Sequence, residues 1–200
     1  MTVYKIYPKG FASNSYLLTA DGETAVAIDP AQPRILEEAE RKGLHVQYVL
    51  LTHGHFDHIG GCAALQGAGA KVGCLAREKQ IALSDANMGG AFGFPVPPFT
   101  VDFTFEDGDV FELCGVKIEA IATPGHTAGS CCYLVEGALF TGDTLFAGDV
   151  GRCDLPTGSD AALARSLKKL AALEGERCVY AGHGADSTLD TERAHNPYLK

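Results

Sequence analysis

The sequence predicts a layered α/β domain in which helices cover β-sheets. Its length of 200 residues and mass of 21.1 kDa fit one domain, so residues 1–200 are predicted to form a single unit. Hydrophobic residues make up 46% and charged residues 20%, which is close to globular averages and enough for a real core. Early paired apolar runs, followed by runs that alternate with helical patterns, indicate sheets covered by helices.

Short apolar runs rich in β-branched residues predict the strands, at 3–7, 15–18, 25–28, 48–51, 71–74, 116–121, 131–135, 138–140 and 178–180. Helical patterns fall between some of them, at 33–42, 60–66, 77–84 and 159–173. Ser159 and Asp160 can cap the last of these helices. Residues 85–104 are instead rich in Gly, Pro and Phe. A loop of this kind is either a functional lid or a surface loop pinned by its own aromatic side chains.

Charge and composition exclude several classes of function. The chain has 16 Lys and Arg against 25 Asp and Glu, a net charge of -9 and a pI near 5.2, which argues against nucleic-acid binding. No apolar stretch is long enough for a membrane span, and residues 1–8 lack the apolar region of a signal peptide. Seven scattered cysteines without a CxxC pair are typical of a reduced protein. We therefore expect a cytoplasmic protein without nucleic-acid or membrane partners.

The segment from His53 to His58 contains three histidines and one carboxylate, Asp57, directly after the predicted strand 48–51. In extended chain, His53 and His55 point to the same side, while Asp57 and His58 lie where the chain turns into the helix predicted to begin near residue 60. Imidazole nitrogens and a carboxylate oxygen at this spacing suit zinc or a similar divalent ion. The segment is therefore a candidate metal site.

Three further candidates also follow predicted strands. His126 comes after strand 116–121, Asp143 after strand 138–140, and His183 after strand 178–180, each with glycine beside it. Loops beyond strand carboxyl ends converge in layered α/β folds, so all seven side chains are expected to face one pocket. Seven donors exceed what one tetrahedral ion binds, but they fit two ions that share a carboxylate.

The alternatives to a metal centre have weak support in the sequence. An isolated histidine often satisfies a local hydrogen bond, and we assign His45 and His195 to the surface because neither has a motif partner. There is no GxSxG elbow, P-loop or GxGxxG turn. Ser130 is interpreted as a turn hydroxyl, and Cys131 and Cys132 as packed strand residues.

The motif from His53 to His58 resembles that of the metallo-β-lactamase superfamily. Within it, the sequence is most similar to the glyoxalase II-like group, the hydroxyacylglutathione hydrolases. The matching segments are 124–127, 142–146, 151–156, 181–184 and 192–199. The resemblance implies a four-layer αββα sandwich with the site at the shared edge of two sheets. Glyoxalase II continues into a C-terminal helical domain, whereas His183 lies near the end of this sequence, so we expect the short bacterial type.

The resemblance also implies a division of the ligands. His53, His55 and His126 would hold one ion, Asp57, His58 and His183 the other, and Asp143 would bridge them. We expect zinc, with iron or manganese as alternatives. The implied activity is hydrolysis of a thioester such as S-lactoylglutathione by a metal-activated hydroxide, which Asp57 would also orient. The partner is then a small-molecule thioester, and no oligomeric state is predicted.

Arg152 is our candidate for binding a carboxylate on the substrate's thiol carrier, because a guanidinium pairs with a carboxylate through two parallel hydrogen bonds. The alternative is a structural ion pair with Asp154, two residues further along the chain.

Three rival functions stay open. A persulfide dioxygenase of the same superfamily would use one iron held by His53, His126 and Asp143. The loop 181–184, however, resembles that of the hydrolases more than that of the dioxygenases. An RNA phosphodiesterase shares the motif, but the acidic balance opposes it. A metal-binding protein without catalytic activity would be expected to have a closed site with four ligands. Seven donors instead leave coordination positions open.

Overall fold

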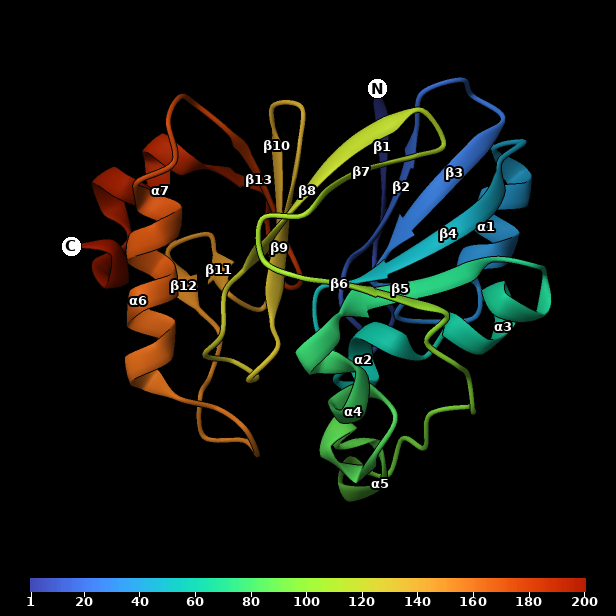
Figure 1. Cartoon of the computed structure of the whole chain (residues 1–200), viewed down its shortest axis with the longest axis horizontal. Helices are drawn as coiled ribbons and strands as arrows, with labels where there is room; N and C mark the ends of the chain where they lie inside the picture. The colour runs from blue at the N-terminus through green and yellow to red at the C-terminus, as the bar shows by residue number, and fades with distance from the viewer.

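Two six-stranded sheets form the centre of the molecule in the computed structural model, which describes residues 1–200 (Figure 1). The first sheet has the order β1 (Thr2–Ile6), β2 (Ser15–Thr19), β3 (Thr24–Ile28), β4 (His45–Leu51), β5 (Lys71–Leu75) and β6 (Phe103–Phe105). The second has the order β14 (Ser187–Thr188), β13 (Cys178–Ala181), β10 (Ala138–Gly142), β9 (Cys131–Val135), β8 (Val116–Ala122) and β7 (Val110–Leu113). A small ribbon of β11 (Leu145–Phe146) and β12 (Asp149–Val150) extends from the second sheet.

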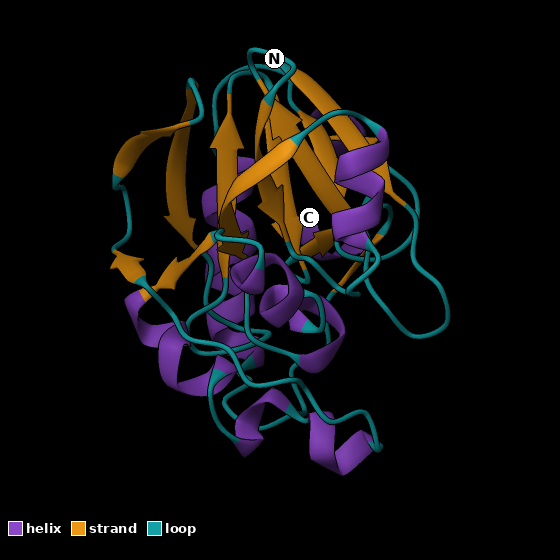
Figure 2. Cartoon of the chain, turned by 90° about the vertical axis from the view of Figure 1, so that its right-hand side faces the viewer, coloured by secondary structure: helices purple, strands orange, loops and turns teal.

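Helices cover the outer face of each sheet. Helices α1 (Ile35–Arg41) and α3 (Cys62–Gly67) lie on the first sheet, and α6 (Asp160–Ala171) and α7 (Leu189–His195) lie on the second (Figure 1). The short helices α2 (Phe56–Ile59), α4 (Lys79–Ala82) and α5 (Gly89–Phe92) gather with the long loops at one end of the strands (Figure 2). Single 3₁₀ turns occur at Ala76–Glu78, Asp85–Asn87 and Pro197–Leu199. None of the helices has the length and apolar character needed to cross a bilayer.

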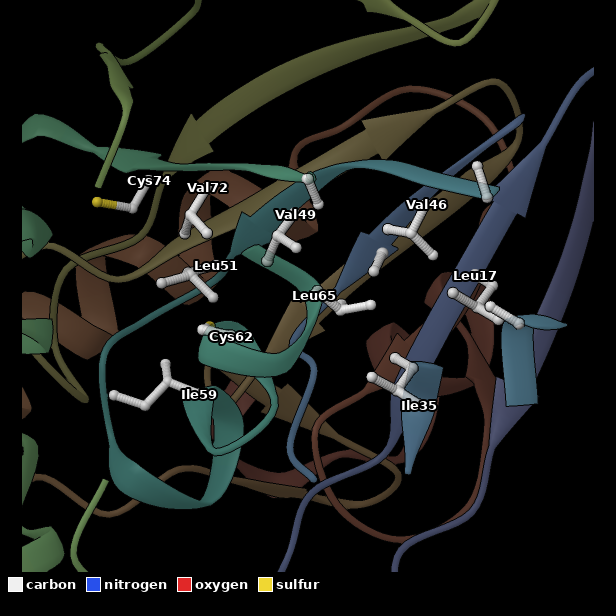
Figure 3. Close-up of a cluster of buried hydrophobic side chains, with 14 of the residues drawn as sticks. Leu17, Ile35, Val46, Val49, Leu51, Ile59, Cys62, Leu65, Val72 and Cys74 are labelled. Carbon is white, nitrogen blue, oxygen red and sulfur yellow. The ribbon is translucent and has the colours of Figure 1, made fainter. Parts of the chain in front are cut away.

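Side-chain alternation along the strands produces three hydrophobic layers. On β2, Leu17 packs outward against the helices, while Leu18 packs inward between the two sheets. The outer layer joins strand residues such as Val49 to Ile35 of α1 and Leu65 of α3 (Figure 3). Strands buried on both faces therefore read as continuous apolar runs in the sequence. Together with the layer beneath α6, these cores make the four-layer αββα sandwich that the family resemblance implies.

All nine predicted strands and the four predicted helical regions are confirmed, with ends shifted by a few residues. Ser159 caps α6 as expected, because its hydroxyl accepts a hydrogen bond from the Ala162 amide. The expected surface positions of His45 and His195 and the packed positions of Cys131 and Cys132 are confirmed too.

Some local features of the structure differ from the prediction. Asp57 and His58 lie within the one-turn helix α2 rather than before a helix, and α3 begins only at Cys62. The segment 85–104 is not a bare loop, because it holds a 3₁₀ turn capped by Ser84 and the helix α5, and it ends in β6. Strands β6, β7, β11, β12 and β14 were missed because each has only two to four residues and none forms a continuous buried apolar run.

The two sheets are tied together where the ligand loops begin. The amide of Cys131 on β9 donates to the Thr52 carbonyl at 2.8 Å, and the Tyr133 hydroxyl donates to the Leu51 carbonyl at 2.5 Å. Gly142 has φ +48°, and a Cβ there would overlap the Thr52 side chain. Glycine therefore allows β10 to approach β4 at this edge.

Phe140→Ala is expected to lower the free energy of unfolding by about 3–5 kcal/mol, because it opens a cavity between the sheets. Phe140 is fully buried, and its ring lies 5.1 Å from that of Tyr180 and 5.2 Å from that of Tyr16. Urea unfolding at matched metal content measures the change. Val110→Ala, at a residue that is 53% exposed, is the control and should shift stability by less than about 0.5 kcal/mol. Equal losses in both variants would contradict this view of the core.

Candidate metal centre

Four strands that run in the same direction within their sheets deliver the predicted ligands to one edge of the sandwich. The segment from His53 to His58 follows β4, His126 follows β8, Asp143 follows β10 and His183 follows β13. Strand β10 is parallel to β13 and antiparallel to β9, which is antiparallel to β8, so the ends of β8, β10 and β13 face the same way. The structure therefore brings all seven predicted side chains together.

The first group consists of His53, His55 and His126, all buried. Their ligand atoms lie within 4.8 Å of one another. The His55 Nδ1 and His126 Nε2 atoms are 2.8 Å apart, and the His53 and His126 rings lie 4.6 Å apart edge to face. Three imidazole nitrogens thus converge on one point.

The second group consists of Asp57, His58 and His183, whose ligand atoms also lie within 4.8 Å of one another. The His183 Nε2 atom lies 3.2 Å from Asp57 Oδ2. His183 has a 37% exposed side chain and borders the solvent, whereas His58 is fully buried. The second group is therefore the more open of the two.

The loop of His183 is held by the N-terminal part of the chain. Asn14 donates from its side-chain Nδ2 to the Ala181 carbonyl at 2.9 Å and from its backbone N–H to the Gly182 carbonyl at 2.7 Å. The Tyr16 hydroxyl donates to the same Ala181 carbonyl at 2.7 Å. These buried hydrogen bonds fix the backbone that carries His183.

Asp143 lies between the two groups. Its Oδ2 atom is 3.6 Å from His126 Nε2 in the first group and 3.5 Å from His183 Nε2 in the second, and its Oδ1 atom is 3.2 Å from His58 Nε2. No other carboxylate has ion-pair contacts with histidines of both groups. Its position is the one that a shared ligand needs.

Hydrogen bonds orient the ligand histidines through the ring nitrogen that faces away from the centre. His58 Nδ1 lies 2.9 Å from Asp29 Oδ2, His126 Nδ1 lies 2.7 Å from the Arg152 carbonyl, and His53 Nδ1 lies 3.2 Å from Thr52 Oγ1. Such partners hold the proton on the outer nitrogen and leave the inner one free to bind a cation.

The inner atoms fit a divalent metal ion. His53 Nε2 and His55 Nε2 are buried and have no hydrogen-bond partner. Buried polar atoms without partners are costly, and imidazole nitrogens with carboxylate oxygens are ligands that zinc and iron accept. The residues present therefore suit a metal centre.

Burial and charge set the protonation of the cluster. Burial lowers the pKa of His53 well below its usual range and that of His55 to about 4, and neighbouring imidazoles add to both shifts. Burial opposes ionisation of Asp57 and Asp143, but the facing imidazoles outweigh it, so the pKa of each carboxyl is lowered. Burial also opposes a charge on His58, yet three neighbouring carboxylates raise its pKa well above the usual value. The carboxylates thus give the site a negative charge that attracts cations.

A cavity of about 760 Å³ opens over the cluster. Its floor includes His55, Asp57, His126, Asp143 and His183. Its walls include Met88, Phe92 and Phe94 from the segment 85–104, which therefore borders the site, together with Phe146, Leu155 and Arg152. The site is large enough for a small-molecule substrate and mostly apolar above the ligands.

Residues 8–183 match the family model described as the metallo-beta-lactamase superfamily. The chain belongs to this superfamily. It is 33% identical to the hydroxyacylglutathione hydrolase GloC of Haemophilus influenzae, over 100% of this chain and 98% of that protein. The family resemblance and the fold that the sequence predicts are thereby confirmed.

Several solved structures have the same architecture. The BLEG-1 B3 metallo-beta-lactamase superposes with a TM-score of 0.91 at 29% identity, covering 100% of both chains. TTHA1623 in a di-iron-bound form superposes with a TM-score of 0.87 at 33% identity, covering 98% of this chain and 100% of that one. ETHE1 from Myxococcus xanthus superposes with a TM-score of 0.81 at 26% identity, covering 98% of this chain and 84% of that one.

The structure places Arg152 at the rim of the cavity, where it pairs with Asp154 through two hydrogen bonds of 2.6 Å. Both side chains are more than half exposed, so the pair contributes little to stability. The ion pair that the sequence suggested as the alternative is therefore formed, and the guanidinium still borders the space above the ligands.

Sequence reasoning missed two buried carboxylates that support the ligand loops. Asp29 accepts hydrogen bonds from the Thr52 amide and hydroxyl and contacts His58. Glu78 accepts from the Gly54 amide at 2.7 Å and from the Thr127 hydroxyl at 2.8 Å. Burial raises the pKa of Glu78 to about 7, against the effect of these hydrogen bonds. Both residues stand outside any motif, and only the buried strand before Asp29 could have drawn attention to it.

Gly182→Ala should reduce metal binding at the second group, because a Cβ there would overlap the Asp143 carboxylate and lie 2.7 Å from His58 Cε1. We expect the metal content of the purified protein to fall by about half or more, with little change in secondary structure by circular dichroism. Gly137→Ala is the matched control, since a Cβ there meets no atom within 4 Å. A Gly182 variant with unchanged metal content would mean that this tight packing is not required.

Proposed function

We propose that the protein is a metal-dependent hydrolase that cleaves a thioester such as S-lactoylglutathione. The main observation in support is the convergence of two three-ligand groups on either side of Asp143 beneath an open cavity. A closed structural site would have no such space. The similarity over the full chain to a hydroxyacylglutathione hydrolase favours a thioester among the substrates of the superfamily.

In this proposal His53, His55 and His126 hold one divalent ion, Asp57, His58 and His183 hold a second, and Asp143 binds both. When bound, these ions supply a hydroxide at neutral pH and polarise the substrate carbonyl. Zinc is our first choice. Iron and manganese are the alternatives, and iron gains support from the di-iron-bound form of TTHA1623.

The protein's own groups then have distinct roles in the reaction, in which water adds to the acyl carbon, the carbon–sulfur bond breaks, and an acid and a thiol leave. In this proposal Asp57, with a 17% exposed side chain at the cavity floor, also orients the attacking water as a hydrogen-bond acceptor. Met88, Phe92 and Phe94 exclude bulk water from the carbonyl, which strengthens electrostatic interactions there. Arg152 pairs with a carboxylate of the thiol carrier.

Cytoplasmic location is part of the same proposal. All seven cysteines are free, and four of them are buried at Cys62, Cys74, Cys131 and Cys132. Free thiols in this number suit a reducing compartment.

The second candidate function is that of a persulfide dioxygenase with one iron on His53, His126 and Asp143. A two-histidine, one-carboxylate iron site leaves open positions for oxygen, and iron is the metal of a related structure. A site with one iron does not explain why Asp57, His58 and His183 form a second group of potential ligands, so we place this function second.

Metal analysis of the purified protein, combined with two assays, separates the candidates. We expect two ions per chain, hydrolysis of S-lactoylglutathione, and no oxygen uptake with glutathione persulfide. One iron per chain with oxygen uptake and no thioester cleavage would overturn the proposal.

Asp143→Ala is expected to deplete both metal positions and to lower kcat by at least about a hundredfold, because it removes the carboxylate that faces both groups. His183→Ala should instead empty mainly one position, leaving about one ion per chain. Metal content after dialysis and steady-state kinetics measure both effects. Retention of two ions and a near-normal rate by the Asp143 variant would exclude its bridging role.

Arg152→Ala tests the substrate contact against the ion pair with Asp154. A substrate role lowers kcat/KM about tenfold for a thioester whose thiol bears a carboxylate and leaves a neutral thioester unaffected. The melting temperature should stay unchanged, because the ion pair is exposed. Equal kinetic losses for both substrates, with a lower melting temperature, would identify Arg152 as a structural clamp only.

A further inference from the structure

A second cavity of about 510 Å³ adjoins the main cavity on the side of Asp57. Six residues line both spaces, namely Gly10, Phe11, Ala12, Phe56, Asp57 and Phe94. Beyond them, Pro33, Pro95, Val96 and Pro97 continue an apolar wall, with Lys9 and Gln32 among the few polar groups. We call this space the side cavity. It shares part of its lining with the cavity over the metal centre but contains only Asp57 of the seven candidate ligands.

Phenylalanines from three separate segments form the boundary between the cavities. Phe56, inside the ligand motif, stacks on Phe92 at 5.5 Å and on Phe94 at 5.6 Å, and Phe11 lies 5.9 Å from Phe94. Phe11 is 77% exposed, and Phe92 and Phe94 are each 48% exposed. Exposed aromatic side chains that cluster at a cavity mark a surface that an apolar ligand covers.

Two parts of the main cavity's lining differ in chemistry. Arg152 lines the main cavity but not the side cavity, and its carbonyl contacts His126 of the first ligand group. The aromatic boundary adjoins Asp57 of the second group. A thioester whose carbonyl lies over the ligands therefore extends one arm toward a guanidinium and the other toward aromatic rings. Because carboxylate-bearing thiol carriers match the guanidinium, the acyl group is left for the aromatic end.

We propose that the side cavity binds the acyl group of the substrate and selects thioesters with a large apolar acyl group, either aryl or medium-chain alkyl. This inference rests on the proposed thioester hydrolysis. A short hydroxyacyl group such as lactoyl leaves the side cavity unfilled. Octanoyl and phenylacetyl groups reach past Phe94 and bury apolar surface against Phe11 and Pro97.

The test is a series of glutathione thioesters that differ only in the acyl group, from acetyl and lactoyl to hexanoyl, octanoyl and phenylacetyl. For the metal-loaded protein, kcat/KM is expected to rise about two- to fourfold per added methylene until the side cavity is filled. Phe94→Ala should lower the ratio of octanoyl to lactoyl kcat/KM by about tenfold. Tyr7→Ala is the control, because Tyr7 is a 68% exposed aromatic residue that lines neither cavity, and it should keep the wild-type ratio.

Failure of this inference is distinguishable from failure of the proposed function. Hydrolysis with no dependence on acyl length would overturn the side cavity's role and leave thioester hydrolysis standing.

Absence of hydrolysis for every thioester would reject the proposed function. In that case, calorimetric measurement of carboxylate binding tests separately whether the side cavity binds an acyl group. We expect octanoate to bind the wild-type protein and Tyr7→Ala at least tenfold more tightly than acetate, and Phe94→Ala to lose most of that difference. Equal affinities for octanoate and acetate would overturn the inference.

Discussion

The carboxylate of Asp29 accepts hydrogen bonds from the Thr52 amide and hydroxyl and contacts His58 Nδ1 at 2.9 Å. Asp29 itself follows β3, with φ 48°, and its amide donates to the Leu50 carbonyl of β4. A buried carboxylate is tolerated only when donors surround it, so the loop after β4 must fold around this group. The direction of the His58 ring, and with it the second ligand group and the contact with Asp143, depends on that arrangement.

Much of the fold and the candidate ligand set could be predicted because their signals are local. Strands buried on both faces leave apolar runs such as those of β4 and β10, and each ligand follows the end of such a run. Side-chain type adds the second signal, since histidine and aspartate beside glycine rarely recur at several strand ends without a reason. Convergence of the strand ends then follows from the layered architecture rather than from any one residue.

The features that escaped prediction depend on what the fold brings near. Glu78 is one acidic residue among many until the structure places it beside the Gly54 amide and the Thr127 hydroxyl. Phe11 is recognised as part of a cavity wall only when the structure shows its ring beside that of Phe94, which belongs to a distant segment. The helix α2 is a single turn, too short for a period, although it carries two of the candidate ligands. Local patterns thus identify ligands better than the groups that support them.

The hydrogen bonds from Asn14 and Tyr16 to the Ala181 carbonyl span 167 and 165 residues of sequence. Contacts between such distant segments form late, because the loop-closure entropy must be lost before they contribute. During synthesis, the first and last parts of the chain cannot meet until Ala181 has left the ribosome. The loop that carries His183 can therefore take its final position only after nearly the whole chain has been made.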